Sequence, residues 1–490
     1  MRMFRKIFRE VKEWWGENWT GVAKLIMVVF WFLGILMRLG VAIEVKMPAW
    51  NYDMGGPDGY GHMGYMWRIY QTGRLPQWNY TQFYHPPLHY LIGAGVLKIS
   101  SIFTQDAELM QNLLKIMPFI WSVLILVVAW RMFGEVGMRK RMKYVAMTVM
   151  LFQTGLIRMA CSVNNDSLSI LLILYSLLWL IRWWKNPSVK LAGVLGLFTG
   201  LAVMTKASGM VLFLVEFLAL MVKFLERKDK KRIWRNYAKM ALVFMLISLP
   251  IGLWYPVRNY MKFGQELTYV LDLGNVEKNV IDRPVSGPER GFMTKLEEEG
   301  ARATIFWIKN HENTLEHSLF ERVVPPGMEQ LLIGRRRVDA SRDYYNLYAS
   351  VILTSLYEDL GVSEEKYGEV VISALSVIVM VWASVILAGV MTRGLVRVLS
   401  GIRAERVEFE MIMFIYMVIL IFGYVMANLR LPMGCTTSFR YLMPIMVASL
   451  TVTGMEEKMA RGRIYRRAIY LGLLLMVVAY GLADLAIMAG

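Results

Sequence analysis

TGVAKLIMVVFWFLGILMRLGVAI, residues 20–43, is the first long apolar run of the chain and the stretch that decides its fold class. A run of about 17 to 25 apolar residues is long enough to cross the hydrocarbon core of a bilayer as a helix. No small-residue cleavage site follows it, so the run predicts a retained membrane anchor rather than a signal peptide. Ten similar runs follow, and together they predict an all-α polytopic membrane protein with about eleven transmembrane helices: Leu113–Phe133, Tyr144–Val163, Asp166–Trp184, Val189–Thr205, Ala207–Leu225, Met240–Val257, Val370–Met391, Phe409–Asn428, Thr437–Met455 and Ala468–Met488.

The composition supports this fold class, because hydrophobic residues make up 56% of the chain. The formal net charge is +17, but Lys and Arg fall in short clusters between the apolar runs, a pattern that argues against nucleic-acid binding. Such clusters are typical of cytoplasmic loops, so the positive-inside rule predicts a cytoplasmic N-terminus and an external C-terminus. Cys161 and Cys435 have no metal-ligand spacing and imply no disulfide framework.

The apolar runs divide the chain into four parts. Residues 1–19 mix basic and aromatic side chains, which predicts an amphipathic helix on the cytoplasmic surface. In the first outer loop, PPLHYLIGAGVLKISSIF is too short to span and predicts an interfacial helix, and YYNLYASVILTSLY in the second long loop predicts a segment that dips toward the membrane. The four parts are residues 1–19, a transmembrane catalytic module at 20–257 that includes the first outer loop at 44–112, an extracytoplasmic loop or cap at 258–369, and C-terminal transmembrane helices at 370–490.

Polar chemistry is concentrated in WNYDMGGPDGYGHMGYMWRIYQTGRLPQWNYTQFYHPPLHYLIGAGVLKIS, residues 50–100, which holds Asp53, Asp58, His62, His85 and His89. Asp58 precedes His62 by four residues, so in a helix both side chains share a face, and the imidazole could orient the carboxylate or join it in holding a metal. Asp58 follows a proline and is equally compatible with a simple helix N-cap. Two prolines after His85 restrict the backbone there, which fits either a positioned side chain or a plain turn.

Ionisable side chains at the ends of apolar helices are expensive in a membrane and are candidates for function. The predicted topology puts seven of them at the outer ends of separate segments, where they could line one cavity. Their excess of positive charge suits a ligand that carries phosphate. The alternative is that each one snorkels to the interface or forms a local ion pair. The seven are Asp58, Arg158, Asp166, Lys206, Arg258, Arg430 and Arg440.

Several motifs resemble the polyprenyl-phosphate-dependent glycosyltransferases of the C-type superfamily (GT-C), in particular the protein O-mannosyltransferase-like proteins and the aminoarabinose transferase. PDGYGHMGYMWRIYQTGRLP followed by YHPPLHYLIGA is similar to the first outer loop of that family. VNNDSLSILLILYSLL resembles its second acidic motif, GLFTGLAVMTKASGMVLFL its G-L-A-x-x-T-K signature, WYPVRNYMKFG its W-x-x-R-N segment and SFRYLMPIM its R-Y-x-x-P motif. The motifs occur in the order of the family and are spread over most of the transmembrane part.

The resemblance implies roles for individual residues. Asp58 would be the catalytic acidic residue, with Asp53 as the alternative because the family's Glu after the first Asp is Gly59 here. Asp166 would be a second acidic residue, and Lys206 would contact phosphate. His85 stands where the family often has Glu, which leaves the identity of any divalent metal open. The implied substrate-binding residues are Lys206, Arg258, Arg440, His62, His85 and Tyr84, and the candidate metal ligands are Asp58, His62 and His85.

These observations predict a membrane enzyme that moves a sugar from a polyprenyl-phosphate donor to a hydroxyl acceptor, with inversion and with Asp58 as general base. The predicted location is the plasma membrane, with the active site on the extracytoplasmic side. A transporter or flippase of lipid-linked saccharides is the main alternative, and Glu216 inside an apolar run is the residue that favours it. A non-catalytic scaffold or receptor is a third possibility. The sugar and the acceptor are not identified by the sequence.

Overall fold

The computed structural model describes residues 2–44, 61–77, 81–226, 230–265, 307–309, 344–357, 367–403, 409–430 and 438–489, with side chains omitted at some of their edges. The described chain is helical apart from β1 (Trp307–Lys309) and β2 (Tyr344–Asn346), which pair antiparallel with Ile308 opposite Tyr345. In the first half, the helices are α1 (Arg2–Glu44), α2 (Gly61–Thr72), η1 (Thr81–Tyr84), α3 (Leu88–Ser100), α4 (Ala107–Leu113), α5 (Ile116–Glu135), α6 (Lys140–Leu151), α7 (Thr154–Arg158), α8 (Asp166–Lys185), α9 (Val189–Val203), η2 (Ala207–Met210), α10 (Val211–Leu225) and α11 (Lys230–Phe263). In the second half they are α16 (Leu347–Tyr357), α17 (Tyr367–Arg403), α18 (Phe409–Arg430), η6 (Phe439–Leu442), α19 (Met443–Met459) and α20 (Arg463–Ala489).

The predicted all-α polytopic membrane fold is confirmed. Among the described residues, 8 helices are long and apolar enough to cross a membrane. The other three predicted spans form shorter or interrupted helices. Val189–Thr205 becomes the 15-residue α9, Thr437–Met455 becomes η6 followed by the 17-residue α19, and Tyr144–Val163 is divided between α6 and α7. The predicted interfacial segment of the first outer loop is α3, and the dipping segment of the second is α16.

The break between α6 and α7 has a clear physical cause. Arg38 lies in the middle of the apolar run of α1 and is fully buried. Its guanidinium donates to the carbonyls of Leu151 at 2.8 Å and Met150 at 3.3 Å, which are the open carbonyls at the end of α6. Gln153 then caps α7 by accepting a hydrogen bond from the backbone of Leu156. The polar side chains replace the backbone hydrogen bonds that a continuous helix would make, which a membrane interior requires.

Close helix packing depends on glycines of α9. Gly196 faces α11 so closely that a Cβ there would lie 2.7 Å from the carbonyl oxygen of Phe244. A Cβ at Gly200 would lie 3.0 Å from the carbonyl oxygen of Ser248. Small residues four apart let two helix backbones approach in a membrane, where dispersion replaces the hydrophobic effect as the driving force.

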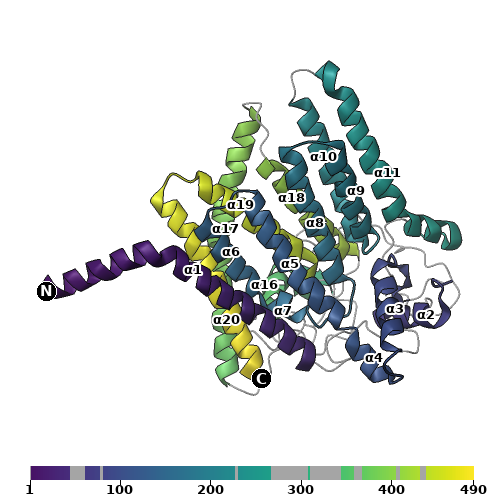
Figure 1. Ribbon diagram of the computed structural model, residues 1–490, viewed down its shortest axis with the longest axis horizontal. Coiled ribbons are helices and arrows are strands. Elements are labelled where there is room, and N and C mark those ends of the chain that lie inside the picture. The colour runs from purple at the N-terminus through teal and green to yellow at the C-terminus, as the bar shows by residue number, and fades with distance from the viewer. Residues whose placement is uncertain are drawn as a thin grey trace.

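The helices of the bundle have two distinct ends. α8 begins at Asp166 and ends at Lys185, and its 20 residues span about 30 Å. Glu135, at the end of α5, pairs with Arg182 at 2.7 Å and with Lys185 at 3.5 Å, so α5 ends where α8 ends. We call these the Asp166 end and the Lys185 end. Figure 1 shows α2, α3 and α4 grouped beside one end of the bundle, away from the end of α10 and the start of α11.

Candidate functional site

An ion cluster forms at the Asp166 end from three segments that are distant in the sequence. Asp166 is the first residue of α8, Lys206 precedes η2, and Arg440 lies in η6. The ammonium of Lys206 donates a hydrogen bond to Asp166 Oδ1, and Arg440 Nε lies 3.4 Å from Asp166 Oδ2. The exposed fractions of the three side chains are only 7%, 15% and 14%. A carboxylate therefore sits between two cations in a setting that water reaches poorly.

Neighbouring polar groups hold this arrangement in place. The side chain of Asn164 accepts a hydrogen bond from the backbone of Asp166 at 3.0 Å, and Asn165 donates to the carbonyl of Thr205 at 3.3 Å. The ring of Tyr441 lies beneath both cations, 4.5 Å from Lys206 Nζ and 5.1 Å from the Arg440 guanidinium carbon. Such cation–π contacts strengthen where solvent is excluded. The α8 start, the η2 start and η6 are thus fixed to one another.

A second group, of histidine and tyrosine side chains, comes from α2, η1 and α3. His62 Nδ1 lies 2.7 Å from Tyr90 Oη, and the ring of His62 stacks on that of His85 with centroids 5.6 Å apart. Tyr84 packs against His85 at 4.1 Å, and His89 packs edge-on against Tyr90 at 5.4 Å. His62, His85 and His89 are all buried.

The histidines are held neutral. Burial lowers the pKa of His85 to about 3, helped by the neighbouring Lys206 ammonium and opposed by the Asp166 carboxylate. Burial also lowers the pKa of His89 to about 3, and it holds that of His62 well below its usual value. A neutral imidazole can donate with one ring nitrogen and accept with the other, so these residues add hydrogen-bonding capacity without adding charge.

The two groups form one site. The backbone N–H of Leu88 donates to the carbonyl of Met204 at 3.2 Å, which joins the start of α3 to the end of α9. His62 and His85 both interact electrostatically with Asp166 and Lys206. The structure therefore brings together five of the predicted site residues, and Tyr84 accompanies them through its contact with His85.

Arg258 connects to this site through aromatic residues instead of through the ion cluster. Its guanidinium donates to the carbonyl of Pro76 at 2.5 Å and to Asn259 Oδ1 at 2.8 Å, and it lies over the ring of Tyr255. Tyr255 Oη lies 2.8 Å from Tyr65 Oη and donates to the carbonyl of Phe83 at 2.6 Å. Arg258 thus fastens the end of α11 to the first outer loop.

Other predicted residues lie elsewhere. Asp53 and Asp58 fall outside the described residues, as does the side chain of Arg430. Arg158 is buried and interacts electrostatically with Asp484 of α20. Within the described parts of the chain, His, Cys, Asp and Glu side chains nowhere gather in a group of three that could hold a metal ion. His62 already lies against a tyrosine hydroxyl, and the third predicted ligand, Asp58, is among the residues not described.

Sequence reasoning missed several polar residues of the interior. Tyr90, Tyr65 and Tyr255 belong to the site, but an aromatic residue in an apolar stretch looks the same whether it packs or positions a ligand. Arg38 was visible as a lone arginine inside an apolar run. Glu216, which favoured a transporter, accepts hydrogen bonds from Ser176 at 2.5 Å and Thr199 at 2.6 Å inside the bundle.

The sequence matches no protein-family model and no curated protein. Among solved structures, the oligosaccharyltransferase AglB from Archaeoglobus fulgidus, in complex with an inhibitory peptide and a dolichol-phosphate, has 13% identity and a TM-score of 0.48, covering 96% of this chain and 56% of that one. The Archaeoglobus fulgidus oligosaccharyltransferase in complex with Zn and sulfate has 14% identity and a TM-score of 0.46, and the match covers 93% of this chain and 52% of that one. ArnT from Cupriavidus metallidurans bound to undecaprenyl phosphate has 13% identity and a TM-score of 0.45, and the match covers 96% of this chain and 77% of that one.

The chain spans about half the length of the archaeal oligosaccharyltransferase. The chemistry of the site has to come from the residues of this chain.

Proposed function

We propose that the protein is a membrane glycosyltransferase that transfers a sugar from a polyprenyl-phosphate donor to a hydroxyl acceptor. The observation that carries the proposal is the meeting of Asp166, Lys206 and Arg440 at the same end of the bundle. Together these three side chains carry one positive charge, in a place where solvent screens charge weakly. An electropositive site at the ends of membrane helices suits a phosphate whose lipid tail remains among those helices.

In the proposed reaction, Lys206 and Arg440 bind the donor phosphate and stabilise the negative charge that grows on it when the bond to the sugar breaks. Preorganised cations of this kind are usually the largest electrostatic contribution to such a step. Asp166 fixes the positions of both cations. The acceptor hydroxyl attacks the sugar carbon from the opposite side, with inversion, and passes its proton to Asp58, with Asp53 as the alternative base.

The neutral histidines fit a role in binding the sugar. Buried imidazole and phenol groups beside a phosphate site offer donors and acceptors for sugar hydroxyls, and aromatic rings offer apolar faces. His62, His85 and Tyr84 provide these groups, and Arg258 holds the loop that carries them. We place this site on the extracytoplasmic side of the plasma membrane, because the basic loops gather at the Lys185 end.

The test is sugar transfer by the purified full chain, using a panel of radiolabelled polyprenyl-phosphate sugars and a cell-envelope fraction as the source of acceptor. Lys206→Gln and Arg440→Gln each remove one charged contact to phosphate, which is expected to raise the KM for the donor about 10- to 100-fold. Lys190→Gln is the matched control, because this exposed lysine lies on α9 at the other end of the bundle. Asp58→Asn or Asp53→Asn should lower kcat by about 10² to 10⁴.

Two outcomes contradict the proposal. Full activity in both aspartate variants removes the general base, and unchanged donor affinity in both Lys206→Gln and Arg440→Gln removes the phosphate site. Movement of the lipid-linked sugar across a reconstituted membrane without any transfer would instead support the flippase alternative.

A further inference from the structure

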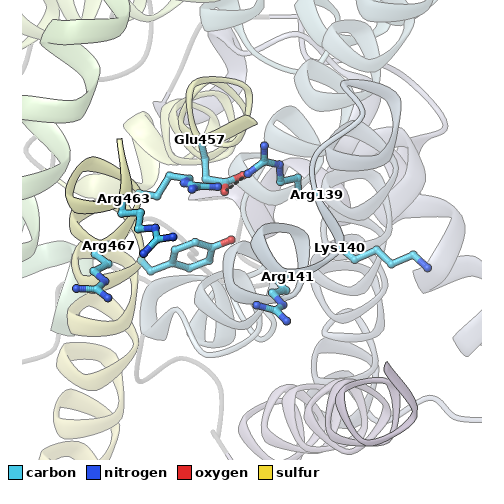
Figure 2. A pocket seen from close by; sticks show the side chains of 8 residues that line it. Arg139, Lys140, Arg141, Glu457, Arg463 and Arg467 are labelled. Atoms are coloured by element: carbon cyan, nitrogen blue, oxygen red, sulfur yellow. Dashed lines mark hydrogen bonds and ion pairs between the residues drawn. The ribbon is translucent and has the colours of Figure 1, made fainter. Parts of the chain in front are cut away.

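A basic cavity of about 500 Å³ opens at the Lys185 end, outside the site described above. Its walls come from the start of α6, the end of α19 and the start of α20. Figure 2 shows Arg463 and Arg467 on one side of the cavity, Arg139 and Arg141 on the other, and Glu457 between them. Six basic residues and one acidic residue line it, together with Tyr470: Arg139, Lys140, Arg141, Arg463, Arg466, Arg467 and Glu457.

The cavity and the candidate functional site lie at opposite ends of the bundle. Arg440 precedes α19 at the Asp166 end, whereas Glu457 lies near the C-terminus of the same helix. The 17 residues of α19 separate them by about 25 Å. Arg139 follows shortly after Glu135, whose ion pairs define the Lys185 end. A phosphate group bound in the cavity is therefore distinct from one bound at the candidate functional site.

The acidic residue of the cavity wall pairs with Arg139. Arg139 lies 3.1 Å from Glu457 Oε1, and Glu457 is 2% exposed on its side-chain surface. This pair anchors the wall to the protein. Arg463 and Arg467 lie across the cavity from Arg139 and Arg141, around a space that can accommodate a ligand (Figure 2). A bound anion there would reduce the repulsion between these like charges.

Backbone dipoles add to this positive potential. α6 begins at Lys140 and α20 begins at Arg463, so two helices of 12 and 27 residues start at the wall of the cavity. The first N–H groups of a helix lack partners within the helix and favour negative charge. A signal for membrane topology requires positive charge at this end, but it requires neither a cavity nor two helix starts around it.

We propose that this cavity binds a phosphate-bearing group with at least two negative charges. α20 belongs to a span that begins at Arg463, and α5 belongs to one that ends at Glu135, so the cavity lies at the boundary between lipid and water. The same chemistry has two sources, the head group of an anionic or diphosphate lipid and a soluble pyrophosphate compound. The lining arginines bind both, because guanidinium groups pair with phosphate oxygens in a bidentate geometry.

The test uses the purified full chain and the charge-neutralised double variant Arg463→Gln/Arg467→Gln. The matched control is Lys231→Gln/Arg232→Gln, which removes two exposed charges at the start of α11 on the same face. That helix starts at the Lys185 end, because the preceding helix ends with Lys223 over the ring of Trp184. In one arm, native mass spectrometry counts the lipids retained from nanodiscs of phosphatidylcholine mixed with phosphatidylglycerol or cardiolipin. In the other, calorimetry measures the binding of inorganic pyrophosphate in a neutral detergent.

In the lipid arm, the wild type and the control are expected to prefer the anionic lipid over phosphatidylcholine about thirtyfold more strongly than the double variant does. In the calorimetric arm, they are expected to bind pyrophosphate with about thirtyfold higher affinity than the double variant. This factor follows because each basic residue near an anionic surface contributes about fivefold. Retention of lipid alone identifies a lipid head group as the ligand, and binding of pyrophosphate alone identifies a soluble one. The proposal is overturned if the wild type binds neither, or if the control loses as much affinity as the double variant. An unchanged melting temperature shows that the double variant is folded. If its melting temperature falls, Arg141→Gln/Arg467→Gln takes its place in both arms.

Discussion

Removing the charge of Asp166 should destabilise the protein more than any exposed substitution. Asp166→Asn keeps the shape of the side chain but leaves Lys206 and Arg440 close together without their carboxylate. At 3.4 Å and an effective dielectric constant of about 20, the Coulomb attraction between Arg440 and the carboxylate is about 5 kcal/mol. Breaking a buried ion pair from one side usually costs about 3 to 5 kcal/mol, because the remaining charge stays buried without compensation. We expect a loss of about this size in the free energy of unfolding.

A double-mutant cycle tests whether the geometry is the cause. Lys206→Met alone leaves Asp166 paired with Arg440, and the double variant Asp166→Asn/Lys206→Met removes one charge of each sign. The double variant should therefore lose about 1 to 3 kcal/mol less than the sum of the two single variants. Equilibrium unfolding in mixed micelles with increasing SDS measures each value, with Lys190→Met, at an exposed lysine of α9, as control. Single effects that add to within about 0.5 kcal/mol would refute a direct interaction between Asp166 and Lys206.

Two further predictions concern the histidines and the packing of α9. Because the pKa of His85 and of His89 is about 3 in the folded state and about 6.5 when unfolded, the unfolded state binds more protons between these pH values. The free energy of unfolding should fall as the pH drops below 6.5, by about 1.4 kcal/mol per unit for each histidine, and His89→Phe should remove about 1.4 kcal/mol per unit of this slope in pH-dependent unfolding. Gly196→Ala should destabilise the protein by about 1 to 3 kcal/mol, because its Cβ would meet backbone of α11. Gly95→Ala, whose Cβ would meet nothing within 4 Å, should be neutral or stabilising. Thermal unfolding measures both effects, and equal melting temperatures for the two glycine variants would contradict the packing argument.

The fold class could be predicted because hydrophobic length alone determines which segments can cross a bilayer. Eight of the predicted spans are single long apolar regions in the structure. The division of Tyr144–Val163 could not be predicted from that segment, because the residue that replaces its missing backbone hydrogen bonds, Arg38, lies more than a hundred positions earlier in the chain. Hydropathy measures the cost of exposing a segment to lipid, and it contains no information about such distant partners.

The candidate site was predictable to a similar degree. The sequence placed Asp166, Lys206 and Arg440 at the ends of separate helices, and the positive-inside rule assigned those ends to one face. It could not establish that one carboxylate would contact both cations, because that depends on the packing of α8, α9 and α19. The burial of His89, and hence its low pKa, also depends on neighbours that are distant in the sequence.

The buried charges of this protein differ in the kind of group that they contact, and this difference separates structural from functional candidates. Arg38 donates to three backbone carbonyls and a serine hydroxyl, and Glu216 accepts from two hydroxyls, so each is fully explained by the fold around it. In the cluster at the Asp166 end, two cations share one carboxylate. Selection for stability alone favours replacing such a cluster with apolar side chains of similar volume, which often leaves stability equal or higher. Its presence where helices end at the membrane surface is therefore best explained by a ligand with negative charge.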